Sequence, residues 1–307
     1  MNILITGGSG FVGSHLLKRL ILTNHKIFII KRNSSDLWRI KSIAKKINIL
    51  EMKSFKDLSH IFAHEKFDLI IHLAMKYVKS DESWQDAQEI NEVNITYPSI
   101  LLMMADQYKT KAFINTGTCF EYNLSNNPLS ETDFINPYNY YASTKVAFED
   151  IFKFYILHGK ILGLTLKLSY PYGEMDNKKV IPLIIKSIIT NTPLELTYGE
   201  QKLGFTYVED IIDAYLQAIN FIAKDKLKSY EVFNIGANNT YQLKEIVGHL
   251  EKISGKKSLI SFSKPYPPNE IMHISCNFEK AKKILNWFPK TDIIEGLTKT
   301  YQYYQTK

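Results

Sequence analysis

Cysteine is scarce in this chain of 307 residues, and Cys119 and Cys276 provide neither a disulfide framework nor metal-ligand spacing. The 8 histidines are dispersed, without a His-x-x-x-His pair, so we do not expect a metal site. No apolar run approaches the roughly 18 residues that span a bilayer, and no charged and apolar leader precedes the first apolar segment. We therefore expect a soluble protein of the reducing cytosol, with no membrane partner.

Long basic runs are also missing, although the formal net charge at pH 7 is +7. The lysines are scattered among acidic residues, so nucleic-acid binding is not indicated. A moderate positive charge is compatible with attraction of an anionic small molecule. The length suits one large α/β unit or two packed domains.

The first motif that is present lies at the start of the chain, where a short apolar strand runs into closely spaced glycines and then an amphipathic helix. Glycines let the backbone approach a pyrophosphate and aim the N–H groups and positive end of the helix at its charge. This order predicts a dinucleotide site, and the alternative is a tight turn without a ligand. The residues that we expect to bind the cofactor here are Gly7, Gly10, Phe11, Val12 and Gly13.

Apolar segments then alternate with helical patterns, as in a Rossmann-type, doubly wound parallel α/β sheet. Ligands of such sheets bind beyond the carboxyl ends of the strands. This rule places Leu73 and Ala74, after the fourth strand, and Thr118, after the fifth, at the site. The later strands are expected at residues 26–30, 48–51, 67–73 and 112–115. A helix is expected before the third strand and before the fourth, and a long helix at about 84–107.

The tip of the second strand carries basic and polar residues, with no acid before Asp36. In this fold class the tip lies beside the adenosine ribose, where an acid favours NAD and a basic or hydroxyl cluster favours the 2′-phosphate of NADP. We therefore favour NADP over NAD, while a solvated strand end remains the alternative. The cofactor-binding candidates at this tip are Lys31, Arg32, Asn33 and Ser34.

A tyrosine and a lysine four residues apart, Tyr141 and Lys145, follow a helix start that we expect at Asn136 and Pro137. Residues at this spacing share a helix face. The ammonium group would favour phenolate and lower the pKa of Tyr141, so that it can give and take a proton closer to neutrality. The spacing is weak by itself in a chain with 19 tyrosines, but it follows a glycine turn and a threonine at a strand end.

With these sites, the sequence resembles the extended short-chain dehydrogenase/reductase family, the nucleotide-sugar epimerases, dehydratases and ketoreductases. The resemblance covers nearly the whole chain. Within the family the chain is most similar to 4-ketoreductases of the CDP-abequose and CDP-paratose synthase type. The further segments that carry the resemblance are Asn94, Tyr207-Val208-Glu209-Asp210 and Phe233-Asn234-Ile235-Gly236 for the family, and Lys31-Arg32, Ile71-His72-Leu73-Ala74 and Asn269-Glu270-Ile271-Met272 for the ketoreductase type.

The resemblance implies that Tyr141 donates a proton, that Lys145 holds the nicotinamide ribose while tuning Tyr141, and that Thr118 hydrogen-bonds the reacting oxygen. It adds Asn94 to the cofactor-binding residues and implies a homodimer through the two helices at 84–107 and after Tyr141. The implied reaction is NADPH-dependent reduction of the C4 keto group of a nucleotide-linked 4-keto-6-deoxyhexose, in deoxysugar biosynthesis for surface polysaccharide. The alternatives are a C4 epimerase and a non-catalytic dinucleotide-binding protein.

The later chain departs from the family where the substrate nucleotide is usually held. Tyr170 replaces a typical asparagine, Leu203-Gly204-Phe205 stands where Arg-Asp-Phe or Arg-Asp-Tyr is usual, and Pro267 stands where an arginine often grips the diphosphate. Lysines could replace the arginines as point charges without their bidentate fork. These lysines are Lys178, Lys179 and Lys202. The substrate-binding candidates are Thr118, Tyr141, Tyr170 and Lys179.

Two further expectations concern the domains and the type of reaction. We expect an NADP-binding domain of residues 1–168 with 205–230 and a smaller α/β nucleotide-sugar domain of residues 169–204 with 231–307.

We expect reduction without dehydration, because family dehydratases place Asp-Glu directly after the catalytic threonine, where this chain has Cys119 and Phe120. Glu121 could stand in for these acids, although its spacing differs by one.

Overall fold

The computed structural model describes residues 1–77, 83–177 and 179–307. Its contacts divide the chain into two units, each made of three segments. The first unit comprises Met1–Asn123, Asp133–Lys167 and Ala214–Phe233, and the second comprises Leu124–Thr132, Leu168–Asp213 and Asn234–Lys307. The second unit therefore includes residues 124–132 and 205–213, which we had placed in the first from the sequence.

Contacts within the second unit explain this difference. The backbone of Leu129 exchanges hydrogen bonds with Ser275 and Asn277, each of 2.9 Å. The Trp287 indole nitrogen donates to the Asp210 carbonyl at 2.7 Å. Both segments are thus tied to residues near the carboxyl end of the chain, and this long-range pairing has no local sequence signal.

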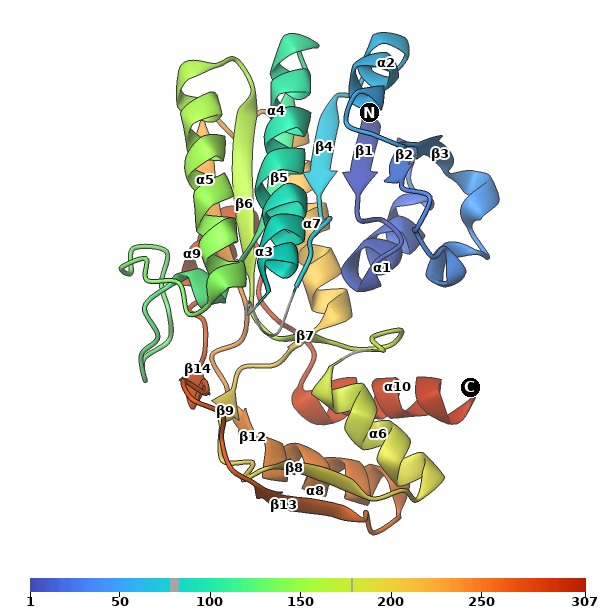
Figure 1. Ribbon diagram of the computed structural model, residues 1–307, viewed down its shortest axis with the longest axis vertical. Helices are drawn as coiled ribbons and strands as arrows, with labels where there is room; N and C mark the ends of the chain where they lie inside the picture. Colours follow the sequence, from blue (N-terminus) through green and yellow to red (C-terminus); the bar gives the residue numbers. More distant parts are fainter. Residues whose placement is uncertain (78–82, 178) are drawn as a thin grey trace. The chain divides into compact units, whose positions relative to one another are not determined.

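The first unit is built on a sheet with the strand order β11-β6-β5-β4-β1-β2-β3. The pairings of β1 with β2 and β4, of β2 with β3 and of β4 with β5 are parallel, as Figure 1 shows. The order reverses between β1 and β4, where doubly wound sheets bind dinucleotides. The strands are β1 (Asn2–Thr6), β2 (Lys26–Lys31), β3 (Asn48–Glu51), β4 (Leu69–His72), β5 (Ala112–Thr118), β6 (Leu162–Leu168) and β11 (Tyr230–Ile235).

Helices cover both faces of this sheet, with α4 and α5 on one face and α7 on the other (Figure 1). The strands are apolar on both faces for that reason. On the α4 and α5 face, Leu4, Ile70 and Phe113 pack in one buried cluster with Leu101 and Phe148 from the helices. The helices are α1 (Phe11–Leu20), α2 (Asp57–His64), α3 (Trp84–Asn91), α4 (Tyr97–Gln107), α5 (Tyr140–His158) and α7 (Val208–Ala223), of which α7 belongs to this unit from Ala214 onward.

Two helical predictions need correction. The helix expected before residues 48–51 consists of short 3-10 turns, η1 (Trp38–Ile40) and η2 (Ala44–Lys46). Its apolar residues Leu37, Ile40 and Ile43 recur every three residues, which is the period of a 3-10 helix.

The helix expected at 84–107 is interrupted by a π-helical turn, η3 (Glu92–Thr96), between α3 and α4. Pro98 follows directly, and a proline clashes with the carbonyl four residues earlier, here that of Asn94. The wider π turn relieves this conflict, and such turns are frequent at functional sites.

The start of α5 also differs from the prediction. Asn139, rather than Asn136, caps the helix, because its side-chain oxygen accepts the Ala142 N–H at 2.9 Å. Asn136 instead donates its backbone N–H to the Glu121 carbonyl at 3.0 Å. The later start places Tyr141 in the first turn of the helix.

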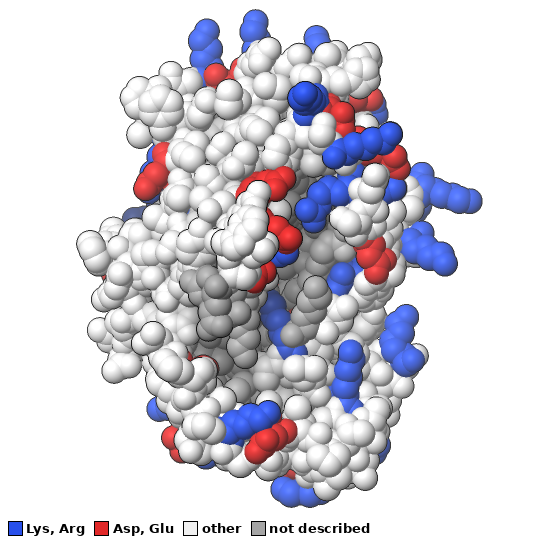
Figure 2. Space-filling view, in the orientation of Figure 1, with Lys and Arg blue, Asp and Glu red and all other residues white. Residues whose placement is uncertain are grey.

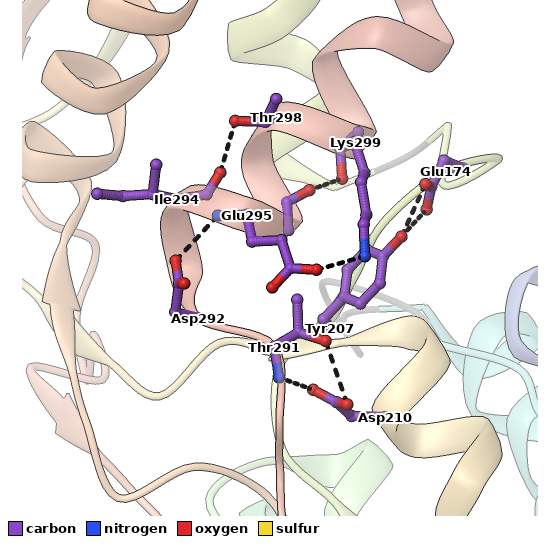
Figure 3. Close-up of polar contacts among 11 residues, drawn as sticks. Glu174, Tyr207, Asp210, Thr291, Asp292, Ile294, Glu295, Thr298 and Lys299 are labelled. Atoms are coloured by element: carbon purple, nitrogen blue, oxygen red, sulfur yellow. Dashed lines mark hydrogen bonds and ion pairs between the residues drawn. The ribbon is translucent and has the colours of Figure 1, made fainter.

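The second unit consists of small sheets and four helices within its described residues. Figure 3 shows how α10 is held: Thr291 donates its N–H to Asp210 at 3.0 Å, and Lys299 pairs with Glu295 at 2.6 Å. The strands are β7 (Pro171–Tyr172), β8 (Leu194–Thr197), β9 (Lys202–Leu203), β10 (Thr206–Tyr207), β12 (Tyr241–Gln242), β13 (Ile260–Lys264) and β14 (His273–Ile274). The helices are α6 (Val180–Thr190), α8 (Leu243–Ser254), α9 (Glu279–Leu285) and α10 (Ile293–Gln305).

Charged side chains of both signs are interspersed over the face shown in Figure 2. None of the helices in the described parts of the chain is long and apolar enough to cross a membrane. Among the same residues, no three His, Cys, Asp or Glu side chains gather as a metal site would require.

Candidate active site

The glycine turn joins β1 to α1 at the point where the strand order reverses. Gly7 has a φ of +70°, and the Gly10 N–H donates to the Gly7 carbonyl at 2.9 Å. A Cβ atom at Gly7 would lie 2.6 Å from the Ala74 nitrogen, and one at Gly13 would lie 2.3 Å from the Gly7 carbonyl oxygen. The turn therefore has room only for glycine at both positions, and α1 begins at Phe11, directly after it.

The ends of β1 and β4 are tied together beside this turn. The Thr6 hydroxyl accepts the Ala74 N–H at 3.3 Å and is hydrogen-bonded to His72 Nδ1 at 2.8 Å. Burial, reinforced by the charge of Lys145, lowers the pKa of His72 well below its ordinary value. The His72 imidazole is thus neutral, and it takes part in the hydrogen bonds through Thr6 that hold Leu73 and Ala74 against the glycine turn.

The tip of β2 is basic, as expected, but one of its two cations is already paired. The Lys31 ammonium group lies 2.7 Å from Glu51 at the end of β3. Arg32, Asn33 and Ser34 are exposed. Arg32 is therefore the better placed cation for an anionic ligand at this tip.

The Tyr141, Lys145 and Thr118 side chains are all buried, with exposed fractions of 8%, 3% and 7%. Thr118 ends β5, and the two other residues lie on successive turns at the start of α5. The Glu121 carboxylate accepts the Thr118 N–H at 2.7 Å and also interacts electrostatically with Tyr141 and Lys145. The structure thus brings the three predicted catalytic residues together around one acidic group.

The direction of the pKa shift of Tyr141 differs from the sequence expectation, which was a lowered pKa. Burial raises the pKa of Tyr141 above its usual value, and the Glu121 carboxylate raises it further. Burial lowers the pKa of Lys145, although Glu121 and Glu149 oppose this shift. Burial and the nearby carboxylate thus favour the neutral phenol of Tyr141, the form that can donate a proton.

Asn94 is buried in the π-helical turn η3 and links two segments of the site. Its amide nitrogen donates to the Lys76 carbonyl at 2.9 Å and to the Thr144 hydroxyl at 3.0 Å, and its oxygen accepts the Lys76 N–H at 2.8 Å. Thr144 directly precedes Lys145. Asn94 thus holds the chain after β4 to the catalytic helix, while direct contact with a cofactor remains a prediction.

The substrate-binding candidates of the later chain lie in the second unit. Tyr170 has a φ of +34°, and its ring meets that of Phe205 edge-on with 5.7 Å between the centroids. The Lys179 ammonium group donates to the Pro171 carbonyl at 2.9 Å. Lys178 lies outside the described residues.

Lys202 lines a cavity of about 510 Å³ in the second unit. Its other lining residues come from separate segments of the chain, and of these residues only Met272 belongs to a segment that the sequence analysis had singled out. They are Asn126, Glu200, Thr240, Met272 and His273. Polar and charged side chains make up most of this lining.

A parallel sheet with a glycine turn at its switch point, and a buried Tyr-Lys pair beside a strand-end threonine, define a dinucleotide-binding protein of the Rossmann type. The model of the NAD dependent epimerase/dehydratase family matches residues 3–236, and the chain belongs to this family. The resemblance drawn from the sequence is thereby confirmed.

The relatives include both reductases and epimerases. CDP-abequose synthase of Salmonella muenchen is 28% identical over 97% of this chain and 96% of its own. The dTDP-4-dehydro-6-deoxyglucose reductase of Escherichia coli is 25% identical over 97% of this chain and 95% of its own. UDP-glucuronic acid 4-epimerase from Bacillus cereus, solved with UDP-glucuronic acid and NAD, has a TM-score of 0.90 and 26% identity, covering 100% of this chain and 99% of that one. Similarity alone does not choose between the two reactions.

Proposed function

We propose that this protein is an NADPH-dependent oxidoreductase that reduces the C4 keto group of a nucleotide-linked 4-keto-6-deoxyhexose. The observation that carries the proposal is the burial of Tyr141 and Lys145, at the start of α5, and of Thr118, at the end of β5. Reduction of a ketone creates an alkoxide, and a neutral phenol is the form that can protonate it. The name of the relative from Escherichia coli supports the class of substrate.

In this proposal, Thr118, Tyr141 and Lys145 of the first unit each have a different role in the reaction. A bound nicotinamide cofactor supplies the hydride. The Thr118 hydroxyl orients the keto oxygen, and Tyr141 gives its proton to that oxygen as negative charge develops. Lys145, whose ammonium group is one turn further along α5, holds the nicotinamide ribose and favours the phenolate that is left behind.

The glycine turn and the tip of β2 fit a dinucleotide with a 2′-phosphate. The space that Gly7 and Gly13 leave would admit the backbone of the turn to a pyrophosphate, with the first turn of α1 facing the charge. Arg32 and Ser34 are exposed where the adenosine ribose lies in this fold class, and each can donate to a phosphate. We therefore propose NADPH in preference to NADH.

The candidate groups next to Thr118 for chemistry at C3, C5 or C6 are engaged in other contacts. Cys119 is buried, and its sulfur lies 3.5 Å from the Lys167 carbonyl oxygen. Glu121 is engaged by the Thr118 N–H and by Lys167, so it is a structural carboxylate. These contacts favour simple reduction over dehydration or C3/C5 epimerisation.

For the nucleotide, we propose the second unit, with Tyr170 and Lys179 as contacts and Lys202 in the cavity described above. Lysines provide point charges for a diphosphate, but not the bidentate contact of an arginine. The sugar and the base are chosen by these side chains and not by the catalytic residues.

The test is consumption of NADPH absorbance with a panel of CDP-, dTDP-, GDP- and UDP-linked 4-keto-6-deoxyhexoses. We expect net oxidation with one nucleotide and much weaker oxidation with the others. A protein that oxidises no NADPH with any of them is not the proposed reductase.

A C4 epimerase is the second candidate, because the epimerase from Bacillus cereus matches the whole fold with a TM-score of 0.90. An epimerase of this kind would return the hydride to the opposite face of the sugar and need no added reductant. Interconversion of UDP-glucose and UDP-galactose, or of the corresponding uronic acids, without added NADPH would favour this candidate.

A further inference from the structure

A buried ion pair lies under the catalytic threonine. The Lys167 ammonium group on β6 is 2.9 Å from the Glu121 carboxylate, and their side chains are 5% and 1% exposed. Glu121 lies in the 3-10 turn η4 (Cys119–Glu121), which begins where β5 ends at Thr118. Because β5 and β6 are neighbours in the sheet, the pair joins the end of one strand to the next.

The same carboxylate fixes the backbone of Thr118. One Glu121 oxygen accepts the Thr118 N–H at 2.7 Å, and the Thr118 hydroxyl accepts the Phe120 N–H at 3.3 Å. A hydroxyl has a single hydrogen to donate. Because the Thr118 oxygen acts as an acceptor toward Phe120, its hydrogen is available to a ligand.

Gly117 leaves the space that this arrangement needs. A Cβ atom at Gly117 would lie 2.8 Å from the Glu121 carboxylate oxygen and 3.0 Å from Lys167 Cγ. A glycine between Thr116 and Thr118 at the end of β5 thus leaves room for the Glu121–Lys167 ion pair beside it.

The acidic groups around the pair favour the charged form of Lys167. Burial alone would lower the pKa of Lys167, but the carboxylates of Glu121 and Glu149 outweigh it and raise the pKa. Burial also raises the pKa of Glu121, and Lys167 opposes that shift. With an ammonium group at 2.9 Å and an N–H at 2.7 Å, we regard Glu121 as ionised. Lys145 is the other buried cation near these two acids.

We propose that Glu121, held in place by Lys167, is a positioning residue that orients the Thr118 hydroxyl for the keto oxygen. Glu121 acts through the Thr118 backbone and does not itself touch the substrate. This inference rests on the proposed role of Thr118 in the reduction. Its test must therefore separate the ion pair from Thr118 itself.

A double-mutant cycle provides this separation, with CDP-4-keto-6-deoxyglucose and NADPH as the probes, or with the most active nucleotide of the panel. We expect Glu121→Ala to lower kcat by about 10- to 100-fold, as misplacement of a reacting group does. The KM for NADPH should stay within about twofold, because the direct contacts of Glu121 that carry this proposal are with Thr118 and Lys167. In a Thr118→Val background the same change should lower kcat no further, since the hydroxyl that it positions is gone.

Two substitutions of Lys167 test whether its positive charge is what matters for kcat. Lys167→Arg keeps the positive charge beside Glu121 and should retain most of kcat, whereas Lys167→Met should resemble Glu121→Ala. Equal loss for Lys167→Arg and Lys167→Met, or equal loss from Glu121→Ala in both Thr118 backgrounds, would show that the pair only stabilises the fold.

Amide hydrogen exchange tests the pair without any reaction. The Thr118 N–H should exchange slowly in the unmodified protein and at least about tenfold faster in Glu121→Ala, because it loses its acceptor. The Ile114 amide, in the middle of β5, should not change. If Glu121→Ala does not fold, Glu121→Gln, which keeps the acceptor but not the charge, should show a smaller change at Thr118 alone.

The outcomes distinguish the two proposals. Full activity of Thr118→Val would contradict the role of Thr118 in catalysis, while the exchange data would still report on the ion pair. An unchanged Thr118 exchange rate in a folded Glu121 variant would overturn the positioning role, whatever the activity of Thr118→Val.

Discussion

Tyr141 and its neighbour Tyr140 differ in surroundings and therefore in expected function. Tyr141 is buried beside Lys145, whereas the Tyr140 hydroxyl donates to the Asn91 side chain at 3.0 Å. Burial keeps the Tyr141 proton in place until negative charge develops on a bound ligand. Sequence spacing predicted the pair with Lys145, but not the direction of the pKa shift, because the spacing does not reveal burial.

The first prediction concerns the proton donor. Tyr141→Phe keeps the ring and removes the hydroxyl, so the fold should survive while kcat falls by roughly 10²- to 10⁴-fold, the usual contribution of general acid catalysis. Tyr140→Phe is the matched control and should stay within a few-fold of the unmodified protein. A folded Tyr141→Phe protein with near-normal kcat would remove Tyr141 from the mechanism.

The second prediction concerns the choice of cofactor. Lys31→Asp/Arg32→Ala should weaken binding of NADPH far more than binding of NADH, because the change removes charge-assisted bonds to a 2′-phosphate. Titration of both cofactors, followed by fluorescence, measures the effect. Lys45→Ala/Lys46→Ala removes two exposed charges outside the strand tip and should leave the ratio unchanged. Tighter binding of NADH than NADPH by the unmodified protein would mean that the basic tip has no part in recognition.

The third prediction follows from the low pKa of His72. The unfolded chain takes up a proton at this residue below about pH 6.5, and the folded protein does not. Stability from this residue is therefore complete above pH 6.5 and is lost as the pH falls toward the lower pKa of the folded state. We expect a slope approaching about 1.4 kcal/mol per pH unit.

Denaturant unfolding between pH 7 and pH 5 measures this slope. His72→Asn should flatten it, and the exposed control His158→Gln should not. If His72→Asn and the unmodified protein lose stability in parallel, then His72 is not the residue responsible.

At the scale of helices and strands, local sequence patterns predicted the elements whose structure depends on residues close together in the chain. The glycine turn was predicted correctly because a strand, three glycines and a helix are consecutive in the sequence. The start of α5 was predicted wrongly because two asparagines, Asn136 and Asn139, could each cap it, and only the pairing of Asn136 with Glu121 decides between them. The sequence shows Pro98, but it did not predict the π-helical turn around Asn94, because that turn depends on packing.

The fourth prediction concerns the two helices α4 and α5, through which we propose that the protein forms a homodimer. Met103, Phe154 and Leu157 on these helices are 47%, 58% and 64% exposed, and exposed apolar side chains that gather on one surface can mark a protein–protein interface. Light scattering should show a dimer for the unmodified protein and a monomer for Phe154→Glu/Leu157→Glu. A similar pair of changes on α6 or α10, Leu183→Glu/Ile294→Glu, should leave the dimer intact, and a monomeric unmodified protein would contradict the proposal.

At the scale of the whole molecule, the sequence predicted the first unit better than the second. The first unit repeats strand and helix in order, so its sheet follows from local patterns and known handedness. The second unit pairs β9 with β12 and β14, short strands that are separated by tens of residues. Such pairing depends on long-range contacts, and for that reason residues 124–132 and 205–213 were placed in the other domain.

The most direct test of the proposed reduction follows one hydrogen from cofactor to sugar. NADPH that carries deuterium at both hydrogen positions of the nicotinamide C4 is incubated with the preferred nucleotide-linked 4-keto-6-deoxyhexose, and the product is examined by mass spectrometry and NMR. We predict one deuterium at C4 of the sugar for each NADPH oxidised, and none at C3 or C5. A 4-keto sugar left unchanged, with its NADPH unoxidised, would contradict the reductase, and interconversion of a 4-hydroxy nucleotide sugar with its C4 epimer without net oxidation of NADPH would identify an epimerase.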